Sequence, residues 1–417
     1  MRLMRFLRRF ALGLLAFLAA VAAVVFLSPY LRRIALLGNA DVYDVDKLPS
    51  RTIERSRFPL PLPARVGVDW IAPLGLVYKN EPIRSEDELA RFLEARATTA
   101  FIVVSGGEIV LERYLNGSSR ESYFKSFSIS KSVISALIGA AVGDGLIGGP
   151  DDLVTEYIPE MKDPNFGKVT LGHCLDNTAG IHYTRGVMPW TTRPRMYYTT
   201  DLRRYLAGVR IDREPGRTFM TDDLSPQILG FVLERAIRKA DPGRTVSSYF
   251  QEKIWEPLGA EFDSRWNLDH AGDGLEKGES GFAPRAIDLV KFGLLYLREG
   301  SWSGRQIVPR SWILETTVPG PPGSSPSIEK TGFYKRLWWG QAPFGDTRPD
   351  YYANGHFGQR LYVSPSRDLV LLRLGYADGG VGWTGFLSSI AERCGKTAEG
   401  EAKNDQFERR RQAHVVK

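Results

Sequence analysis

The segment from Phe127 to Gly145, FSISKSVISALIGAAVGDG, constrains the fold of this chain more than any other part of its sequence. Residues Val133–Val142 are apolar on nearly every side of a helix, so this helix has to be buried in a protein core. Gly143 and Gly145 provide a natural end for it. The chain is therefore organised around one buried helix, and polar side chains stand at the start of that helix.

Ser128 and Lys131 lie three residues apart at this start. The spacing places both side chains on one helical face, so the amine can reach the hydroxyl, and a helix N-terminus favours developing negative charge. A serine becomes a nucleophile when a base takes its proton, and a lysine can be that base where its surroundings favour the neutral amine. The alternative is a serine that caps the helix beside a lysine that extends to solvent.

The same S-x-x-K spacing also occurs at Ser122 and at Ser327. Ser122 precedes the helix by a turn or more. Ser327 lies in the Pro- and Gly-rich stretch PGPPGSSPSIEK, where no helix can present it. Context therefore favours Ser128 as the candidate nucleophile.

An uncharged run of 22 residues, Phe10–Leu31, is long enough to span a bilayer. Four arginines precede the run and two follow it, which predicts a cytoplasmic N-terminus and a body on the other side of the membrane. The alternative is a signal peptide cleaved at Ala20-Val21-Ala22, but the run is longer than a usual signal core, so we favour an uncleaved anchor. We thus expect a single-pass protein of the bacterial inner membrane with its globular part in the periplasm.

The net charge of +7 does not indicate a nucleic-acid partner, because six arginines around the apolar run supply almost all of it. The Cys, His and carboxylate residues show no spacing typical of a metal site, so we predict no metal and no cofactor. The two cysteines are Cys174 and Cys394. Nothing in the sequence places them together, and Cys174 is expected to be a small buried residue.

The sequence divides into four parts by composition. Residues 1–33 are the anchor, and residues 34–84 read as an extended crossing segment because they are rich in Pro and Arg and weakly periodic. Residues 85–400 form the globular domain. Residues 401–417 are a charged tail without apolar periodicity, which predicts disorder.

The globular part is predicted to be a single α+β domain. Asp87–Ala97 is an amphipathic helix that Ser85 is placed to cap. A hairpin follows that turns at Gly106-Gly107, and a second hairpin near the end of the chain turns at Ser364–Arg367. We expect these early and late strands to share one antiparallel sheet, flanked by helices and interrupted by a mainly helical insert.

Two later stretches carry candidate binding residues. Trp338 and Trp339 are adjacent, and adjacent side chains on an extended segment point to opposite faces, so one can pack in the core while the other lines a substrate pocket. Gly355 and Gly358 stand at a strand edge, where glycine allows close approach to the backbone. A carbonyl oxygen in search of N–H donors is one group that could approach there.

Five fragments in this order resemble the serine β-lactamase and penicillin-binding-protein superfamily, in particular its class C-like branch of esterases and 6-aminohexanoate-dimer-type amide hydrolases. They are SFSISKS, TLGHCLDNTAGIHY, GFAPRAIDLVKFGLLYLREGSWSGRQIVPRSWI, LWWG and the A-x-G-x-x-G-Q pattern that starts at Ala353. The resemblance runs from about Ser85 to Ser389. It implies the β-lactamase/transpeptidase-like form of the α+β fold.

The resemblance also implies roles for particular residues. Ser128 would be acylated by the substrate carbonyl, and Lys131 would help to remove its proton. The third motif of the family maps to His356-Phe357-Gly358, and the backbone N–H groups of Ser128 and Gln359 would form the oxyanion hole. The alternative for His356 is a structural histidine at the strand edge. A literal K-T-G, Lys330-Thr331-Gly332, lies before the tryptophan pair and is treated as a coincidence.

The second motif departs from the family pattern. Where the family carries tyrosine in F-x-Y-x-S/N, this chain has Thr221, and Asp223 takes the last position. A threonine hydroxyl is shorter and much less acidic, so it cannot take over the proton relay of a tyrosine. Three substitutes remain open: Lys131 as sole base, Asp222 or Asp223 acting through a water, or Tyr183, which we also assign to the substrate pocket.

Two functions follow from these observations. The first is a membrane-tethered periplasmic serine hydrolase that cleaves a small ester or amide through an acyl-enzyme on Ser128. The second is a catalytically inactive binding protein of the cell envelope on the same fold, favoured by the missing tyrosine.

Overall fold

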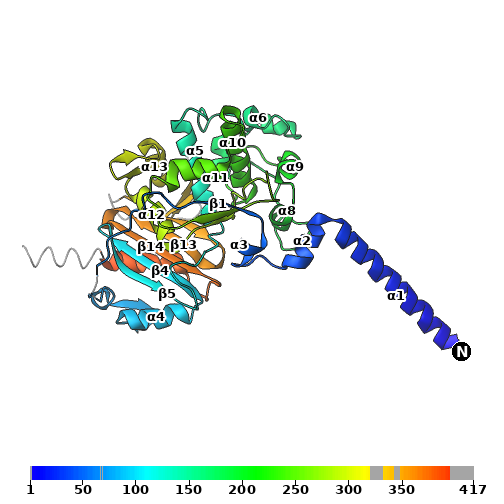
Figure 1. Ribbon diagram of the computed structural model, residues 1–417, viewed down its shortest axis with the longest axis horizontal. Coiled ribbons are helices and arrows are strands. Elements are labelled where there is room, and N and C mark those ends of the chain that lie inside the picture. The colour runs from blue at the N-terminus through cyan, green and yellow to red at the C-terminus, as the bar shows by residue number, and fades with distance from the viewer. Residues whose placement is uncertain (1, 66, 68, 320–331, 342–347, 395–417) are drawn as a thin grey trace, which may run out of the picture.

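The structure is a computed structural model that describes residues 2–65, 67, 69–319, 332–341 and 348–394 (Figure 1). The predicted tail, residues 401–417, and the K-T-G sequence up to Thr331 lie outside the described residues. The long helix α1 projects from a body in which helices cover a central sheet (Figure 1). The helices are α1 Arg2–Leu27, α2 Pro29–Leu37, α3 Asp44–Lys47, α4 Glu86–Glu94, α5 Ile129–Gly143, α6 Val154–Tyr157, α7 Leu171–Leu175, α8 Thr192–Tyr198, α9 Leu202–Ala207, α10 Leu224–Ala240, α11 Val246–Phe250, α12 Ala286–Leu297 and α13 Arg310–Thr317, and residues 383–394 are also helical.

The central sheet has seven strands in the order β10-β11-β12-β13-β14-β4-β5, and each pair of neighbours is antiparallel. The early hairpin β4–β5 lies beside the late strand β14, as the sequence predicts. The described strands are β1 Ser50–Ile53, β2 Leu76–Tyr78, β3 Glu81–Ile83, β4 Thr98–Ser105, β5 Glu108–Tyr114, β6 Ser264–Asn267, β7 Phe282–Ala283, β8 Ser301–Trp302, β9 Arg305–Gln306, β10 Gly332–Lys335, β11 Trp338–Gln341, β12 Tyr351–Gly355, β13 Gln359–Ser364 and β14 Leu369–Gly375.

Helices cover both faces of this sheet. On one face α5 and α12 pack over the sheet, and every residue of α5 from Val133 to Ala141 is buried, as its sequence requires. On the other face α4 packs with the helix of residues 383–394. The Ser85 hydroxyl accepts a hydrogen bond from the Glu88 N–H at 3.2 Å, which confirms the predicted cap of α4. The start of α5 lies beside the C-terminal end of β12, where Gly355 approaches the Ser126 carbonyl.

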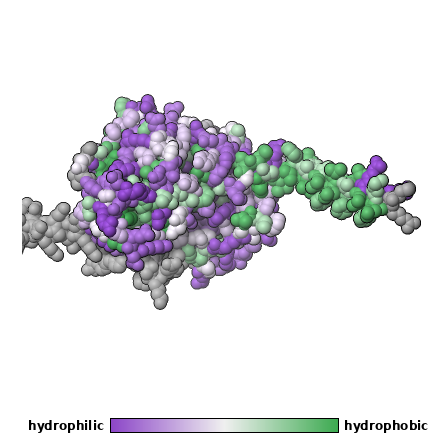
Figure 2. Space-filling model, turned by 90° about the horizontal axis from the view of Figure 1, so that it is seen from below, coloured by the Kyte–Doolittle hydropathy of each residue, from purple (hydrophilic) through white to green (hydrophobic). Residues whose placement is uncertain are grey.

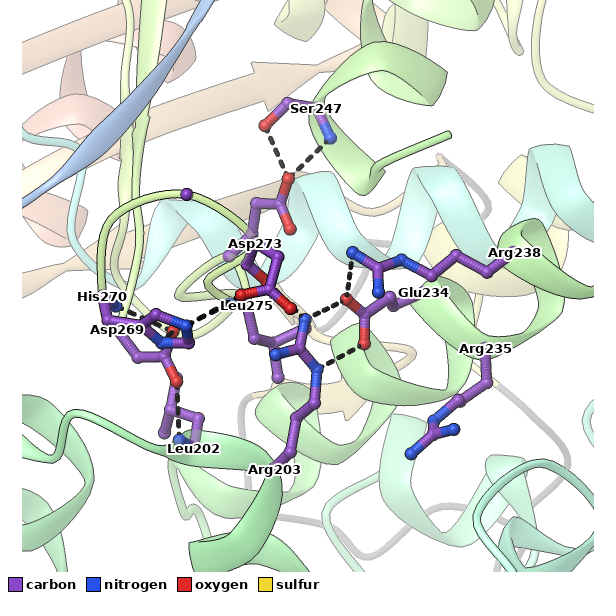
Figure 3. A network of polar contacts seen from close by, with 12 residues as sticks. Leu202, Arg203, Glu234, Arg235, Arg238, Ser247, Asp269, His270, Asp273 and Leu275 are labelled. Atoms are coloured by element: carbon purple, nitrogen blue, oxygen red, sulfur yellow. Dashed lines mark hydrogen bonds and ion pairs between the residues drawn. The ribbon is translucent and has the colours of Figure 1, made fainter. Parts of the chain in front are cut away.

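The helical insert is held together by a polar network (Figure 3). Arg203 of α9 pairs with Glu234 of α10, with an Nε to Oε2 distance of 2.9 Å. Asp269 accepts the backbone N–H of Leu202 at 2.7 Å and that of Leu275 at 2.8 Å (Figure 3). Because these carboxylates are buried, their partners stabilise the charged form and fix α9 beside α10.

The segment 34–84 is folded onto the body and is not the extended crossing segment that we predicted. β1 pairs with β6 over four residues, and β2 pairs with β3. Val45, Leu48 and Ile53 are buried. Its helices and strands are too short to give a detectable period in the sequence, which explains the error.

Helix α2, which follows α1 directly, packs against α8. The Tyr30 hydroxyl donates a hydrogen bond to the Pro189 carbonyl, and Arg33 Nη1 donates to the Thr199 carbonyl at 3.0 Å. Tyr198 of α8 donates in turn to the Gly38 carbonyl. The segment that leaves α1 is therefore fixed to the helical insert by several hydrogen bonds.

Candidate active site

Ser128 precedes the first residue of α5 and is half-buried. Its hydroxyl makes no cap hydrogen bond to the helix, which contradicts the alternative of a capping serine. Among the described residues, none accepts from or donates to the Ser128 hydroxyl. The preceding Phe127 adopts a left-handed conformation with φ of 49°, which is rare for a bulky residue and is typical of strained functional turns. The turn leaves the Ser128 hydroxyl free at the N-terminus of a buried helix.

Lys131 points its amine at the second motif instead of at the serine. Nζ donates to Asp223 Oδ1 at 2.7 Å and to the Asp222 carbonyl at 3.0 Å. The lysine and aspartate side chains of this ion pair are only 13% and 10% exposed. The serine–lysine hydrogen bond expected from the i, i+3 spacing is absent among the described contacts, because a buried carboxylate competes for the amine.

Asp223 is the centre of the polar network. Its Oδ1 accepts from Lys131, and its Oδ2 accepts from the Tyr183 hydroxyl at 2.8 Å and from Arg193 Nε at 3.0 Å. Burial by itself would raise the pKa of the Asp223 carboxyl, but Lys131 and Arg193 outweigh burial and hold the pKa well below its ordinary value. Asp223 is therefore an ionised carboxylate and a poor base.

The neighbouring Asp222 has a different role. Its Oδ1 accepts the Ser225 N–H at 2.6 Å and its Oδ2 accepts the Ser225 hydroxyl at 2.9 Å, so it caps the first turn of α10. Burial raises the pKa of Asp222 to about 6, against an ordinary value of 3.8. Both oxygens are engaged, which removes Asp222 from the possible bases that act through a water. Thr221 is half-buried, and none of the described residues is hydrogen bonded to its side chain.

Tyr183 reaches the second motif from a separate segment. Its hydroxyl donates to Asp223, and burial together with the negative charge of Asp223 raises the pKa of the phenol above its ordinary value. Tyr183 therefore stays protonated. Of the three substitutes left open for the missing tyrosine, this is the one that brings a phenol into the network.

Arg193 belongs to the site but was not predicted. It lies in α8, and its guanidinium pairs with Asp223. The sequence around it, TTRPRMYY, contains two arginines and gives no sign that one of them serves a buried carboxylate. A three-residue pattern cannot reveal a partner that lies 30 positions away.

The third motif sits in the turn between β12 and β13. Desolvation by the surrounding protein and the positive charge of Arg193 lower the pKa of the His356 imidazole, which favours its neutral form. The ring of Phe127 packs against His356 and Phe357, with centroid distances of 5.7 and 5.4 Å. Gly358 has φ of 76°, and a Cβ there would meet the Trp383 ring at 2.6 Å, so only glycine fits.

Gln359 does not supply the oxyanion donor that we predicted. Its backbone N–H donates to the His356 carbonyl, and its side chain forms two hydrogen bonds with the Gly375 backbone, at 2.6 and 2.8 Å. Gly355 lies against the turn that carries Ser128: a Cβ there would lie 2.5 Å from the Ser126 carbonyl oxygen. Strand β12 thus passes the start of α5 at Gly355, ahead of Gln359.

The two tryptophans separate as adjacent residues on a strand should, but Trp338 is not a pocket residue. It is fully buried and packs on Tyr296 with a centroid distance of 4.3 Å. Trp339 is half-buried and packs on Phe219, two positions before Thr221, at 6.5 Å. Only Trp339 remains a candidate wall of a substrate pocket.

Comparison with known proteins agrees with this geometry. The family model described as Beta-lactamase matches residues 86–380. A 6-aminohexanoate-dimer hydrolase from Paenarthrobacter ureafaciens is 27% identical over 310 residues, 69% of this chain and 74% of that protein.

Two solved structures share the fold. A Bacillus anthracis protein with a provisional assignment as 6-aminohexanoate-dimer hydrolase superposes with a TM-score of 0.70 at 20% identity, over 87% of this chain and 93% of its own. A class C β-lactamase mutant superposes with a TM-score of 0.55 at 13% identity, over 75% and 96% of the two chains. The predicted β-lactamase/transpeptidase-like α+β fold is therefore confirmed.

The buried Asp222 predicts an unusual dependence of stability on pH. Because its pKa is higher in the folded state than in the unfolded state, its contribution is fully present below about pH 4 and is lost as pH rises through about 6. As pH rises from 4 to 7, the parent should therefore lose about 3 kcal/mol of unfolding free energy that Asp222→Asn keeps. Urea unfolding at pH 4 and pH 7 measures this difference. Asp151→Asn, at an exposed position, is the control. The prediction would be contradicted if the free energy of unfolding changed equally between pH 4 and pH 7 in the parent and both variants.

Proposed function

The chain belongs to the beta-lactamase family, and we propose that it is a membrane-tethered serine hydrolase that cleaves a small ester or amide through an acyl-enzyme on Ser128. The observation that carries this proposal is the unpartnered Ser128 hydroxyl at the start of a buried helix, one turn before Lys131. A hydroxyl without a partner among the described residues, at a helix N-terminus and one turn from a lysine, is an arrangement suited to nucleophilic catalysis.

In the acylation step, Ser128 Oγ attacks the substrate carbonyl carbon and its proton moves to the neutral amine of Lys131. In the structure the Lys131 amine is engaged by the Asp223 carboxylate, so it has to leave this ion pair to accept the proton. The Ser128 N–H would bind the developing oxyanion. For the second donor we propose the peptide that follows Gly355, where β12 lies against the Ser126 carbonyl.

The Tyr183 phenol would then donate a proton to the leaving group and take up the proton that Lys131 received from Ser128, so that no phenolate persists beside Asp223. The leaving group departs as an alcohol or amine, and the acyl group stays on Ser128. Tyr183 and Lys131 both bind Asp223, which places the two groups of this transfer in one network. A water hydrolyses the acyl-enzyme, and the released acid leaves Ser128 free again. Tyr183 would thus supply the phenol that Thr221 cannot.

An amide is the substrate class that the relatives favour, since the Paenarthrobacter protein is a 6-aminohexanoate-dimer hydrolase. An ester follows the same steps with an easier leaving group. We favour esters and amides over β-lactams as substrates, because the chain resembles the esterase and amidase branch.

The membrane tether rests on α1. The segment Leu3–Leu27 is the one helix of the described chain that is long and apolar enough to cross a membrane, a property that signal sequences share. The contacts of α2 with α8 favour an anchor that stays attached, because the chain folds onto the body directly after α1. The four arginines that precede the apolar run of α1 support a periplasmic body.

A non-catalytic binding protein is the second candidate, favoured by the ion pair with Asp223 that engages the Lys131 amine. Such a protein would keep the pocket of the fold and bind cell-envelope material without turning it over.

The first prediction concerns the nucleophile. The full chain in detergent, exposed to a fluorophosphonate, should gain one covalent adduct by intact mass, because Ser128 is activated. Ser128→Ala should lose the adduct, and Ser122→Ala should keep it, since Ser122 has the same S-x-x-K spacing outside α5. Absence of an adduct on the folded parent would favour the binding protein. The full chain is needed because a truncation at residue 34 cuts α2.

The second prediction concerns the base. Asp223→Asn should label about tenfold faster, because removal of the carboxylate breaks the ion pair that holds the Lys131 amine away from Ser128. The time course of adduct formation measures this rate, with Asp151→Asn as the control. A variant that folds and no longer labels would show that the Asp223 carboxylate itself is required.

The third prediction separates the leaving-group step. Tyr183→Phe should slow amide hydrolysis by about 100-fold and hydrolysis of a p-nitrophenyl ester far less, since p-nitrophenolate departs without a proton. The initial rates on both substrates measure the split. Tyr157→Phe, whose hydroxyl is bound to Asp152 in another part of the fold, is the control. Equal losses on both substrates would contradict a role in protonation.

A further inference from the structure

Three large apolar side chains are exposed at the tip of the segment that follows Tyr183. Val187 is 83% exposed, Met188 is 52% exposed and Trp190 is 70% exposed. Such clusters on a water-soluble surface mark sites of protein or membrane contact. Tryptophan in particular is enriched where a protein meets the membrane–water interface.

The position of this tip follows from one hydrogen bond. The Tyr30 hydroxyl donates to the carbonyl of Pro189, which lies between Met188 and Trp190. Tyr30 is three residues beyond Leu27, the end of α1, and three residues span at most about 11 Å, so the Tyr30 backbone lies close to the end of the apolar span. The tip that Tyr30 contacts therefore lies near the point where α1 would leave the bilayer. Figure 2 shows the apolar surface of α1 continuing up to the body.

A positively charged cavity lies directly behind the tip. It has a volume of about 510 Å³, and Trp190 forms part of its wall. Arg195, Arg204 and Arg210 also line it, and none of their guanidinium groups forms an ion pair or hydrogen bond with another described side chain. Asp201 is the one carboxylate of the lining, and its Oδ1 is engaged by the Arg204 N–H. His182, which also lines the cavity, is paired with Asp212 outside it.

We propose that this cavity binds the head group of an anionic lipid of the bilayer that α1 spans, while Val187, Met188 and Trp190 enter the interface. Three arginines against one engaged carboxylate favour a phosphate-bearing head group, and the apolar rim fits the acyl side of the same lipid. The inference rests on the membrane tether proposed above. The proposed lipid-docking surface is separate from the acyl-enzyme chemistry at Ser128, which does not require a lipid.

This docking surface and the catalytic network share one segment of chain. Thr184 and Thr192 line the cavity, whereas their neighbours Tyr183 and Arg193 bind Asp223. A lipid that orders the segment from one side therefore holds Tyr183 and Arg193 in place on the other. The hydrolase would work on substrate that arrives at the membrane surface.

The test compares amide hydrogen exchange of the full chain in two kinds of lipid nanodisc. One contains phosphatidylcholine alone, and the other contains about 30% phosphatidylglycerol, enough for a negative surface potential. We expect peptides that cover residues 184–192 to exchange about tenfold more slowly in the anionic discs, because the arginines are then occupied. Arg195→Gln/Arg204→Gln should abolish the difference. Arg91→Gln/Arg305→Gln removes the same charge from exposed positions elsewhere and should preserve it.

Each other outcome overturns the proposal. Equal exchange in both discs, or a difference that survives Arg195→Gln/Arg204→Gln, would show that the cavity binds no lipid head group. Slower exchange on addition of inorganic phosphate to the zwitterionic discs would assign the cavity to a soluble anion. Labelling of Ser128 by the fluorophosphonate in the same discs reports the hydrolase function separately. A lipid-independent exchange pattern with intact labelling would therefore overturn the docking alone.

Discussion

One buried carboxylate, Asp223, holds the candidate active site together. It is the acceptor shared by Lys131 of α5, Arg193 of α8 and the Tyr183 hydroxyl, while its own backbone begins α10. A buried carboxylate without partners is costly, and two cations and a phenol offset that cost here. The same ion pairs keep Asp223 ionised and draw Lys131 away from Ser128, so the stability of the site and its readiness to react oppose each other.

The sequence predicts the parts of this fold that depend on local pattern. Burial of α5, the cap of α4 at Ser85 and the two hairpins follow from periodicity and turn residues, and the structure confirms them. The direction of Lys131 could not be predicted, because it depends on a carboxylate 92 positions away. The Gln359 N–H is occupied because of the tight turn after β12. Trp338 is buried because its face of β11 packs against α12. Family motifs fix the order of residues along the chain but not which hydrogen bonds they form.

The segment between α1 and β1 changes how the molecule is organised. Tyr197 and Tyr198 of α8 pack with Leu48 and the α2 side chains, and the Tyr197 hydroxyl donates to the buried Asp44 at 2.6 Å. Helix α8 therefore contacts the segment after α1 through its last turn and Asp223 through Arg193 in its first turn. A helix of seven residues cannot shift at one end without moving the other. The segment that follows α1 is thus part of the framework of the site.

The replacement of tyrosine by Thr221 is best understood together with the aspartate two positions later. A neutral residue at position 223 would leave Lys131 free to act as the base but would give Tyr183 and Arg193 no shared acceptor. Asp223 recruits both of them, and so returns a phenol to the site from a different segment. The recruited phenol comes with a lysine that the same carboxylate holds in an ion pair. We therefore expect a slow hydrolase whose rate depends on how readily the Lys131 amine leaves Asp223, and whose geometry depends on the segment that carries Tyr183 and Arg193.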